Sequence, residues 1–182
     1  MGLDMYLSKR TYVKKWEHQK KEATFDVRVS RGGKIFKGID PEKVSYVEEE
    51  IGYWRKSNQI HNWFVANVQS GTDDCGEYYV SEDNLEDLLK ICNTILDKCK
   101  LEKTGKKETV SVLGKNGLEE EERDELAMTN PEVAEKLLPT QEGFFFGSTS
   151  YDSYYYDDIE ATKEILEEAL KSGGDFQYHS SW

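Results

Sequence analysis

The sequence contains few of the residues that build catalytic or metal centres. Its 182 residues include only three histidines and three cysteines. No histidines are spaced as HxH or HxxxH, and no second pair of cysteines completes a zinc site. The phosphate-binding patterns GxxxxGK[ST] and GxGxxG are also missing. We therefore expect no metal, no cofactor and no catalytic residue, and we expect that the protein is not an enzyme.

Long apolar runs are missing as well. No segment is long enough to span a bilayer, and the N-terminal MGLDMYL carries an acid where a signal peptide has its apolar core. Cys92 and Cys99 are spaced about two helical turns apart, roughly 10 Å, which is too far for a disulfide. We therefore expect the protein to fold in a reducing cytoplasm without a covalent crosslink.

The charge is strongly acidic and unevenly distributed. The net charge is −12, yet the first forty residues hold ten Lys or Arg against five Asp or Glu. The remaining residues hold fourteen basic against thirty-one acidic side chains. Phosphate binding needs a basic surface, so we expect no direct contact with nucleic acid and no membrane partner. A basic protein is the partner that this charge favours, although solubility alone also explains an acidic composition.

The apolar pattern predicts an α+β fold, with a mostly antiparallel sheet of about five or six strands packed by three main helices. We expect one domain over 1–182. Gly32-Gly33 predicts a hairpin, and Ser81 is placed to cap an amphipathic helix. Expected strands are Leu3–Leu7, Phe25–Val29, Glu77–Val80, Gly143–Gly147 and Phe176–Trp182; further expected helices are Asp40–Ser70, Glu132–Leu138 and Asp157–Lys171.

An acidic insertion is expected at about 100–130, where no strong core pattern is found. The window Glu119–Glu125 contains six acids and one arginine. Such a block of like charge is typical of a solvated surface segment. We expect Thr109–Leu113 to form a strand and the acidic window to form an exposed helix.

The stretch Asp40–Ser70 is expected to be the central helix, capped by Asp40 with Pro41 in its first turn. Its apolar stripe becomes polar in the middle. Two interpretations remain open: the polar residues are satisfied hydrogen-bond partners in the core, or they line a pocket. The candidate pocket residues are Trp54, Arg55, Lys56, Asn58, His61 and Trp63.

A second unusual segment is the aromatic and hydroxyl-rich loop Ser148–Tyr156. Its notable side chains are Ser148, Tyr151, Asp152 and Tyr154. Aromatic faces with a few polar groups suit a planar or nucleotide-like ligand. The same side chains are also common at the centre of protein interfaces.

Four blocks of the sequence carry a resemblance to a known group of proteins. These blocks are MGLDMYL at Met1, GYWRKSNQIHNWF at Gly52, LLPTQEGFFFGSTSYDSYYYDDI at Leu137 and the closing SSW. The chain resembles small proteins encoded by phages, prophages and other mobile elements of gut bacteria. By length, acidity and overall sequence it is similar to type II-A anti-CRISPR proteins.

This resemblance implies an inhibitor of the RNA-guided effector nuclease of type II CRISPR systems. Such an inhibitor binds the effector, with or without guide RNA, in the cytoplasm of the bacterial host and blocks target DNA binding or cleavage. The effector holds nucleic acid in a positively charged channel, which the acidic segments suit. We expect contacts from Glu119, Glu120, Glu121, Glu122, Asp124, Glu125, Tyr151, Asp152 and Tyr154.

The alternative function is a phage-encoded protein that binds a nucleotide-like small molecule and sequesters a bacterial immune signal. It would use the candidate pocket on the central helix together with the aromatic loop.

Overall fold

The computed structural model describes residues 2–114 and 117–182 and confirms the α+β class. Its main sheet has the strand order β4-β1-β8-β5, and every neighbouring pair is antiparallel. The main sheet therefore has four strands where five or six were expected. Its strands are β1 (Asp4–Tyr12), β4 (Tyr46–Arg55), β5 (Tyr78–Val80) and β8 (Asp175–Ser181).

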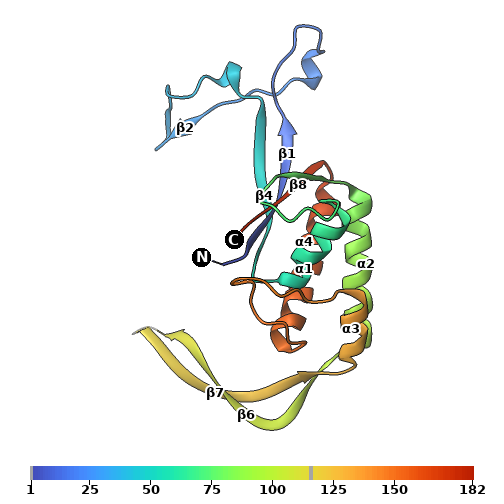
Figure 1. Cartoon of the computed structure of the whole chain (residues 1–182). Coiled ribbons are helices and arrows are strands. Elements are labelled where there is room, and N and C mark those ends of the chain that lie inside the picture. The colour runs from blue at the N-terminus through green and yellow to red at the C-terminus, as the bar shows by residue number, and fades with distance from the viewer. Residues whose placement is uncertain (1, 115–116) are drawn as a thin grey trace.

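Two further pairs of strands lie outside the main sheet. The strands β2 (Ser30–Arg31) and β3 (Lys34–Ile35) form the hairpin expected at Gly32-Gly33. The strands β6 (Leu101–Gly114) and β7 (Gly117–Met128) form a long two-stranded ribbon. Both pairs project from the body of the molecule, at opposite ends of it (Figure 1).

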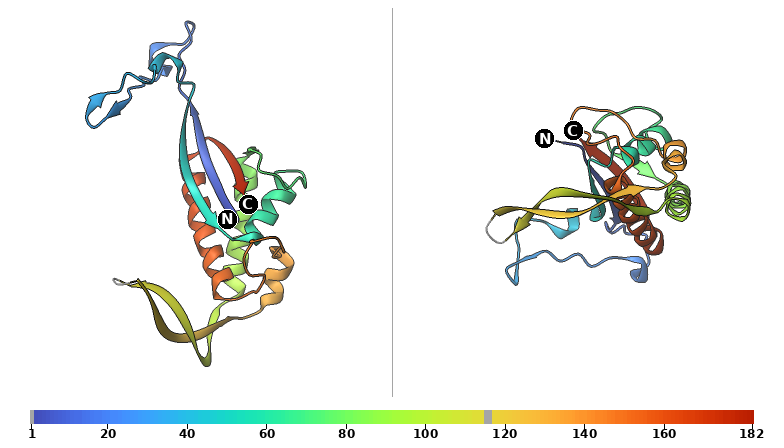
Figure 2. Two further views of the ribbon diagram at one scale, coloured as in Figure 1. Left: turned by 60° about the vertical axis from the view of Figure 1, so that its left-hand side comes forward. Right: turned by 90° about the horizontal axis from the view of Figure 1, so that it is seen from below.

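The helices cover one face of the main sheet (Figures 1 and 2). Ser81 caps α2 as expected: its hydroxyl accepts from the Asn84 N–H in a capping box. Met5 and Leu7 of β1 are buried against this layer, together with Leu88 of α2 and Leu166 of α4. The helices are α1 (Asn58–Asn67), α2 (Glu82–Lys98), α3 (Pro131–Leu137) and α4 (Ser153–Ser172); short 3-10 turns lie at Lys21–Ala23 and Pro41–Lys43.

The prediction of a single helix over Asp40–Ser70 is wrong for the first half of this stretch. Asp40 does cap a turn, because its carboxylate accepts from the Glu42 N–H at 3.2 Å, but that turn is a short 3-10 helix. The chain then runs as β4, and only Asn58–Asn67 is helical. Pairing of β4 with β1 along its whole length overrides the helical spacing of its apolar residues.

Gly52 has a packing role in this strand. A Cβ at Gly52 would lie 2.3 Å from Cγ2 of Ile165 on α4. The glycine therefore allows α4 to lie close against β4.

Three other predictions are also wrong. Phe25–Val29 precedes β2 and is not itself a strand. Glu119–Glu125 belongs to β7, because these residues pair with β6 and form no helix. Gly143–Gly147 forms a turn and not a buried strand. Only Phe146 of its three phenylalanines is buried, whereas Phe144 is 80% exposed.

The segment Ser148–Tyr156 is only partly a loop. Asp152 caps α4, so the helix begins at Ser153 and includes the three tyrosines that follow.

Within the described residues, no helix combines the length and apolar character needed to cross a membrane.

Candidate functional site

The ribbon β6–β7 is the first candidate site. It leaves the body after α2 and returns just before α3, and it curves away from the helices (Figures 1 and 2). At its base, Met128 is buried and Ala127 forms a bridge with Asp152. Further out, residues 117–123 are all exposed. The outer part of the ribbon therefore has no core of its own.

Glu119 to Glu122 form a continuous acidic block in the ribbon. They pair across the ribbon with Val112, Ser111, Val110 and Thr109, none of which is charged. Among the residues that the structure describes, none of the four glutamates forms an ion pair. Successive side chains on a strand point to opposite faces, so the carboxylates lie on both faces of the ribbon.

The other two predicted acids of this segment are used within the ribbon. Asp124 pairs with Nζ of Lys103 at 2.5 Å and with Nζ of Lys107 at 2.6 Å. The hydrogen bond from Lys103, together with the weaker effect of the one from Lys107, lowers the pKa of Asp124 to about 2. The Glu125 carboxylate accepts from the Thr104 hydroxyl at 2.6 Å. Asp124 and Glu125 therefore connect the two strands, and the two lysines leave Asp124 with less charge to offer a partner.

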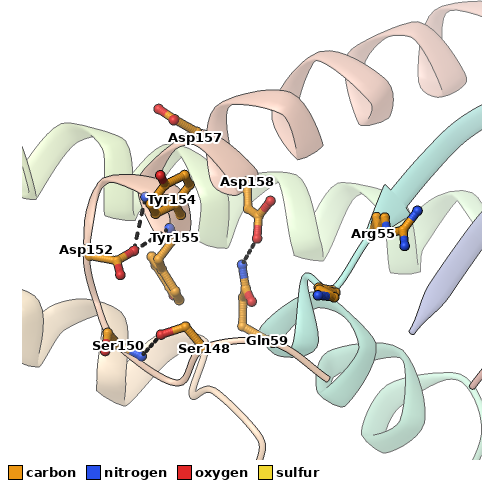
Figure 3. A pocket seen from close by; sticks show the side chains of 11 residues that line it. Arg55, Gln59, Ser148, Ser150, Asp152, Tyr154, Tyr155, Asp157 and Asp158 are labelled. Carbon is orange, nitrogen blue, oxygen red and sulfur yellow. Dashed lines mark hydrogen bonds between the residues drawn. The ribbon is translucent and has the colours of Figure 1, made fainter. Parts of the chain in front are cut away.

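The second candidate site is a pocket with a volume of about 320 Å³, drawn in Figure 3. It lies where the end of β4 and the start of α1 meet the start of α4. The pocket brings together five residues from the two sets that the sequence analysis selected: Arg55 and Lys56 with Ser148, Asp152 and Tyr154. Its other lining residues are Gln59, Gly147, Ser150, Tyr155, Asp157 and Asp158.

Asn58 supports the wall of this pocket from the core, and its own side chain does not line the cavity. Its side-chain amide donates to the carbonyl oxygens of Phe146 at 3.3 Å and Ser148 at 2.8 Å. Its Oδ1 accepts from the Gln141 N–H at 2.9 Å. Because Asn58 is fully buried, these bonds hold the loop 141–148 against the start of α1.

Backbone conformation also shapes the pocket wall. Lys56 has a φ of 62°, which is unusual for a residue with a side chain. Gly147 lies against it, and a Cβ there would approach the Lys56 carbonyl oxygen to 2.9 Å. Position 147 also has a φ of 100°. Both this φ and the close contact with the turn from β4 into α1 require glycine at 147.

The pocket has Arg55 on one side and the carboxylates of Asp152, Asp157 and Asp158 on the other (Figure 3). Asp158 accepts from Nε2 of Gln59 at 2.9 Å, and Asp152 accepts from the N–H groups of Tyr154 and Tyr155. Burial raises the pKa of Asp158 and that of Asp157. Arg55 and Lys56, which both line the pocket, can bind an anionic group. Tyr154 is 58% exposed and offers an aromatic ring.

The remaining members of the predicted helix cluster lie in the core. Trp54, His61 and Trp63 are all less than 9% exposed. Nε1 of Trp54 donates to the Thr162 hydroxyl at 2.9 Å. These side chains cannot reach a ligand in the pocket of Figure 3, and the structure places them as packing residues.

His61 has a partner at each ring nitrogen. Nε2 lies 3.0 Å from Oδ1 of Asp73, and Nδ1 lies 2.8 Å from the Tyr178 hydroxyl. Because a carboxylate only accepts, Nε2 donates to Asp73 and Nδ1 accepts from Tyr178. Burial lowers the pKa of His61, which favours this neutral form.

Tyr151 has a structural role in the loop. Its hydroxyl accepts from the Thr140 N–H at 3.3 Å, and its ring packs against Tyr155.

Sequence reasoning missed Gln59, Asp157 and Asp158 as pocket residues. The two adjacent acids at the start of the expected helix Asp157–Lys171 were the available signal. Within the described ranges, no group of three or more His, Cys, Asp or Glu could hold a metal ion.

Comparisons with protein-family models, with curated proteins and with solved structures gave no match to this chain. The candidate sites therefore rest on the geometry described above.

The role of Asn58 leads to a stability prediction. Asn58→Ala removes the three hydrogen bonds of a buried side chain, so we expect the free energy of unfolding to fall by about 1–3 kcal/mol. Arg55→Ala is the control, because Arg55 is exposed and its loss should change stability by less than about 0.5 kcal/mol. Urea unfolding of both variants measures this. An Asn58→Ala variant as stable as the parent would show that other contacts hold the loop.

Proposed function

We propose that this protein is a non-enzymatic inhibitor that binds a basic effector protein through the outer part of the β6–β7 ribbon. The partner we propose is the RNA-guided effector nuclease of type II CRISPR systems, with or without its guide RNA, in the bacterial cytoplasm. The resemblance described in the sequence analysis supports this class of partner. Binding would block the engagement or cleavage of target DNA.

The observation that carries this proposal is the set of four unpaired glutamates on an exposed ribbon. An isolated two-stranded ribbon is at best marginally stable in water, so a long one with no core gains stability by contacting something else. Glu119 to Glu122 face uncharged partners in β6, and their charge is therefore available to a partner. A basic channel that normally holds nucleic acid is complementary to such a surface.

The dimensions of the ribbon suit insertion into a channel. The twelve residues of β7 extend over roughly 40 Å at about 3.3 Å per residue, less where the ribbon curves. Paired strands present their side chains in a fixed register without losing much conformational entropy on binding. Carboxylates on both faces allow the ribbon to contact two opposing basic walls.

Neutralising the ribbon tests this proposal. We expect the Glu119→Gln, Glu120→Gln, Glu121→Gln, Glu122→Gln variant to fold like the parent, since these side chains are exposed and make no ion pair in the described structure. It should lose most of its protection against RNA-guided cleavage in a plasmid-interference assay, because charge complementarity governs association. Binding by the parent should also weaken as salt concentration rises.

The matched control removes the same charge elsewhere. Glu17, Glu22, Glu42 and Glu135 are exposed residues away from the ribbon, and their change to Gln should leave protection nearly intact. Equal loss in both variants would mean that total charge, and not the ribbon, determines inhibition. Full protection by the ribbon variant would exclude this surface as the contact.

The pocket supports a second candidate function, the binding of a nucleotide-like small molecule. Here Arg55 and Lys56 would bind a phosphate, and Tyr154 would stack on the base. The observation in favour is that the fold brings these residues into one cavity of about 320 Å³, within the usual range for ligand pockets.

A nucleotide panel decides whether this second function holds. If the pocket binds such a ligand, at least one mono-, di- or cyclic nucleotide should raise the melting temperature of the parent. Arg55→Ala and Tyr154→Ala should abolish that shift while melting like the parent alone, because both side chains are exposed. The absence of a shift with every nucleotide would remove the second candidate.

A further inference from the structure

The face of the main sheet opposite the helices is not covered by any other described element (Figure 2, left). Alternation along the strands separates the two faces: Met5 and Leu7 point into the core, whereas Tyr6, Ser8 and Arg10 point outward. We call this outward surface the open sheet face. Its side chains are Asp4, Tyr6, Ser8, Arg10 and Tyr12 of β1, Tyr46, Glu48, Glu50, Tyr53 and Arg55 of β4, Asp175, Gln177, His179 and Ser181 of β8, Tyr79 of β5 and the preceding Glu77.

Aromatic rings are concentrated on the open sheet face. Tyr6 stacks on His179 with ring centroids 4.7 Å apart, and Tyr53 packs against Tyr6 at 5.2 Å. Tyr46 and Tyr79, on the two edge strands, are 57% and 60% exposed. A grouping of exposed aromatic side chains on a single face is characteristic of an interaction surface.

A network of charges crosses the same face. Arg10 of β1 donates to the Glu48 carboxylate at 3.0 Å and to the Glu77 carboxylate at 2.7 Å. The Ser8 hydroxyl donates to Glu48 at 2.8 Å. These bonds hold two carboxylates in fixed positions on either side of β8. An ionised carboxylate has two oxygens and about four acceptor positions, so both keep capacity for a further donor.

A shallow hollow lies at this network. It has a volume of about 630 Å³ and reaches across all four strands of the sheet. Tyr46 and Tyr79 lie at its two sides, with Arg10 and Gln177 between them. Asp175 also lines the hollow and forms no ion pair within the described part of the chain.

We propose that the open sheet face is a docking surface for a basic, arginine- or lysine-rich segment of a protein partner. The hollow offers the carboxylates of Glu48 and Asp175 against a single guanidinium, so its net charge is negative. Glu77, which accepts from Arg10, adds a third carboxylate beside it. Tyr46 and Tyr79 can bind a guanidinium or ammonium group through their ring faces. A cation that enters the hollow therefore meets both of the groups that recognise it.

Single-stranded nucleic acid is the other ligand that an aromatic sheet face can bind, since bases stack on aromatic rings. The charges oppose it here. Nucleic-acid binding needs a basic groove that follows the phosphates, and the one cation of the hollow is already paired with two acids. A basic peptide segment fits the same rings without this repulsion.

This inference concerns a surface separate from the ribbon, and its test needs no nuclease. The probe is a short labelled peptide of alternating arginine and serine, titrated into the full chain and followed by fluorescence anisotropy at low salt. We expect saturable binding by the parent, and no binding of a matched peptide with glutamine in place of arginine.

Two variants locate the peptide. Tyr79→Ser with Asp175→Asn changes exposed groups of the hollow and should weaken binding about tenfold or more. Tyr46→Ser provides a second variant on the opposite side of the hollow and should weaken binding as well. The four-Gln ribbon variant removes more charge but should bind the peptide nearly as well as the parent.

Three results would overturn the proposal. One is the absence of saturable binding to the parent. Another is a loss of binding that does not follow the hollow. Equal binding by the parent and by both folded hollow variants, or a larger loss in the ribbon variant, would indicate nonspecific attraction to acidic groups. The third is tighter binding of a labelled oligothymidylate through the same residues, which would identify the face as a nucleic-acid platform.

Discussion

The pairing of β1 on both of its edges is the constraint on which the rest of the structure depends. β1 comes from the start of the chain, and it pairs with β4 from the middle and β8 from the end. Its inward side chains, Met5 and Leu7, require cover by the helices, while outward side chains such as Tyr6 and Arg10 are partly exposed. The same pairing fixes where β4 ends, and therefore where Arg55 and Lys56 enter the pocket beside α4.

The molecule separates stability from recognition. Buried residues such as Asn58 and His61 complete their hydrogen bonds inside the body and are not available to a ligand. The groups left open are the ribbon glutamates, the pocket side chains and the open sheet face. Two of these three surfaces are predominantly acidic, which explains how an overall charge of −12 is compatible with a well-packed core.

Local signals were sufficient for some elements and not for others. β1 and α2 could be predicted because alternation and the Ser81 capping box are encoded within a few residues. β4 could not, because its apolar residues happen to fit helical spacing and only its partner β1 makes it a strand. Glutamates favour helices over strands, so Glu119–Glu122 misled in the same way.

The pocket shows the same limit. Residue types identified Arg55, Lys56, Asp152 and Tyr154 as notable. Their convergence depends on contacts across about a hundred positions of sequence, such as Gln59 with Asp158, and single-sequence patterns do not report such contacts.

The most direct measurement of the central claim removes the ribbon and retains the body. Lys103 and Leu126 are directly opposite across β6 and β7, so an Asn-Gly turn can replace 104–125 and close the base. Protection against RNA-guided cleavage is then measured in the plasmid-interference assay, alongside the melting temperature. Our account predicts a body that melts close to the parent and gives no protection. Full protection by the folded, shortened protein would contradict it.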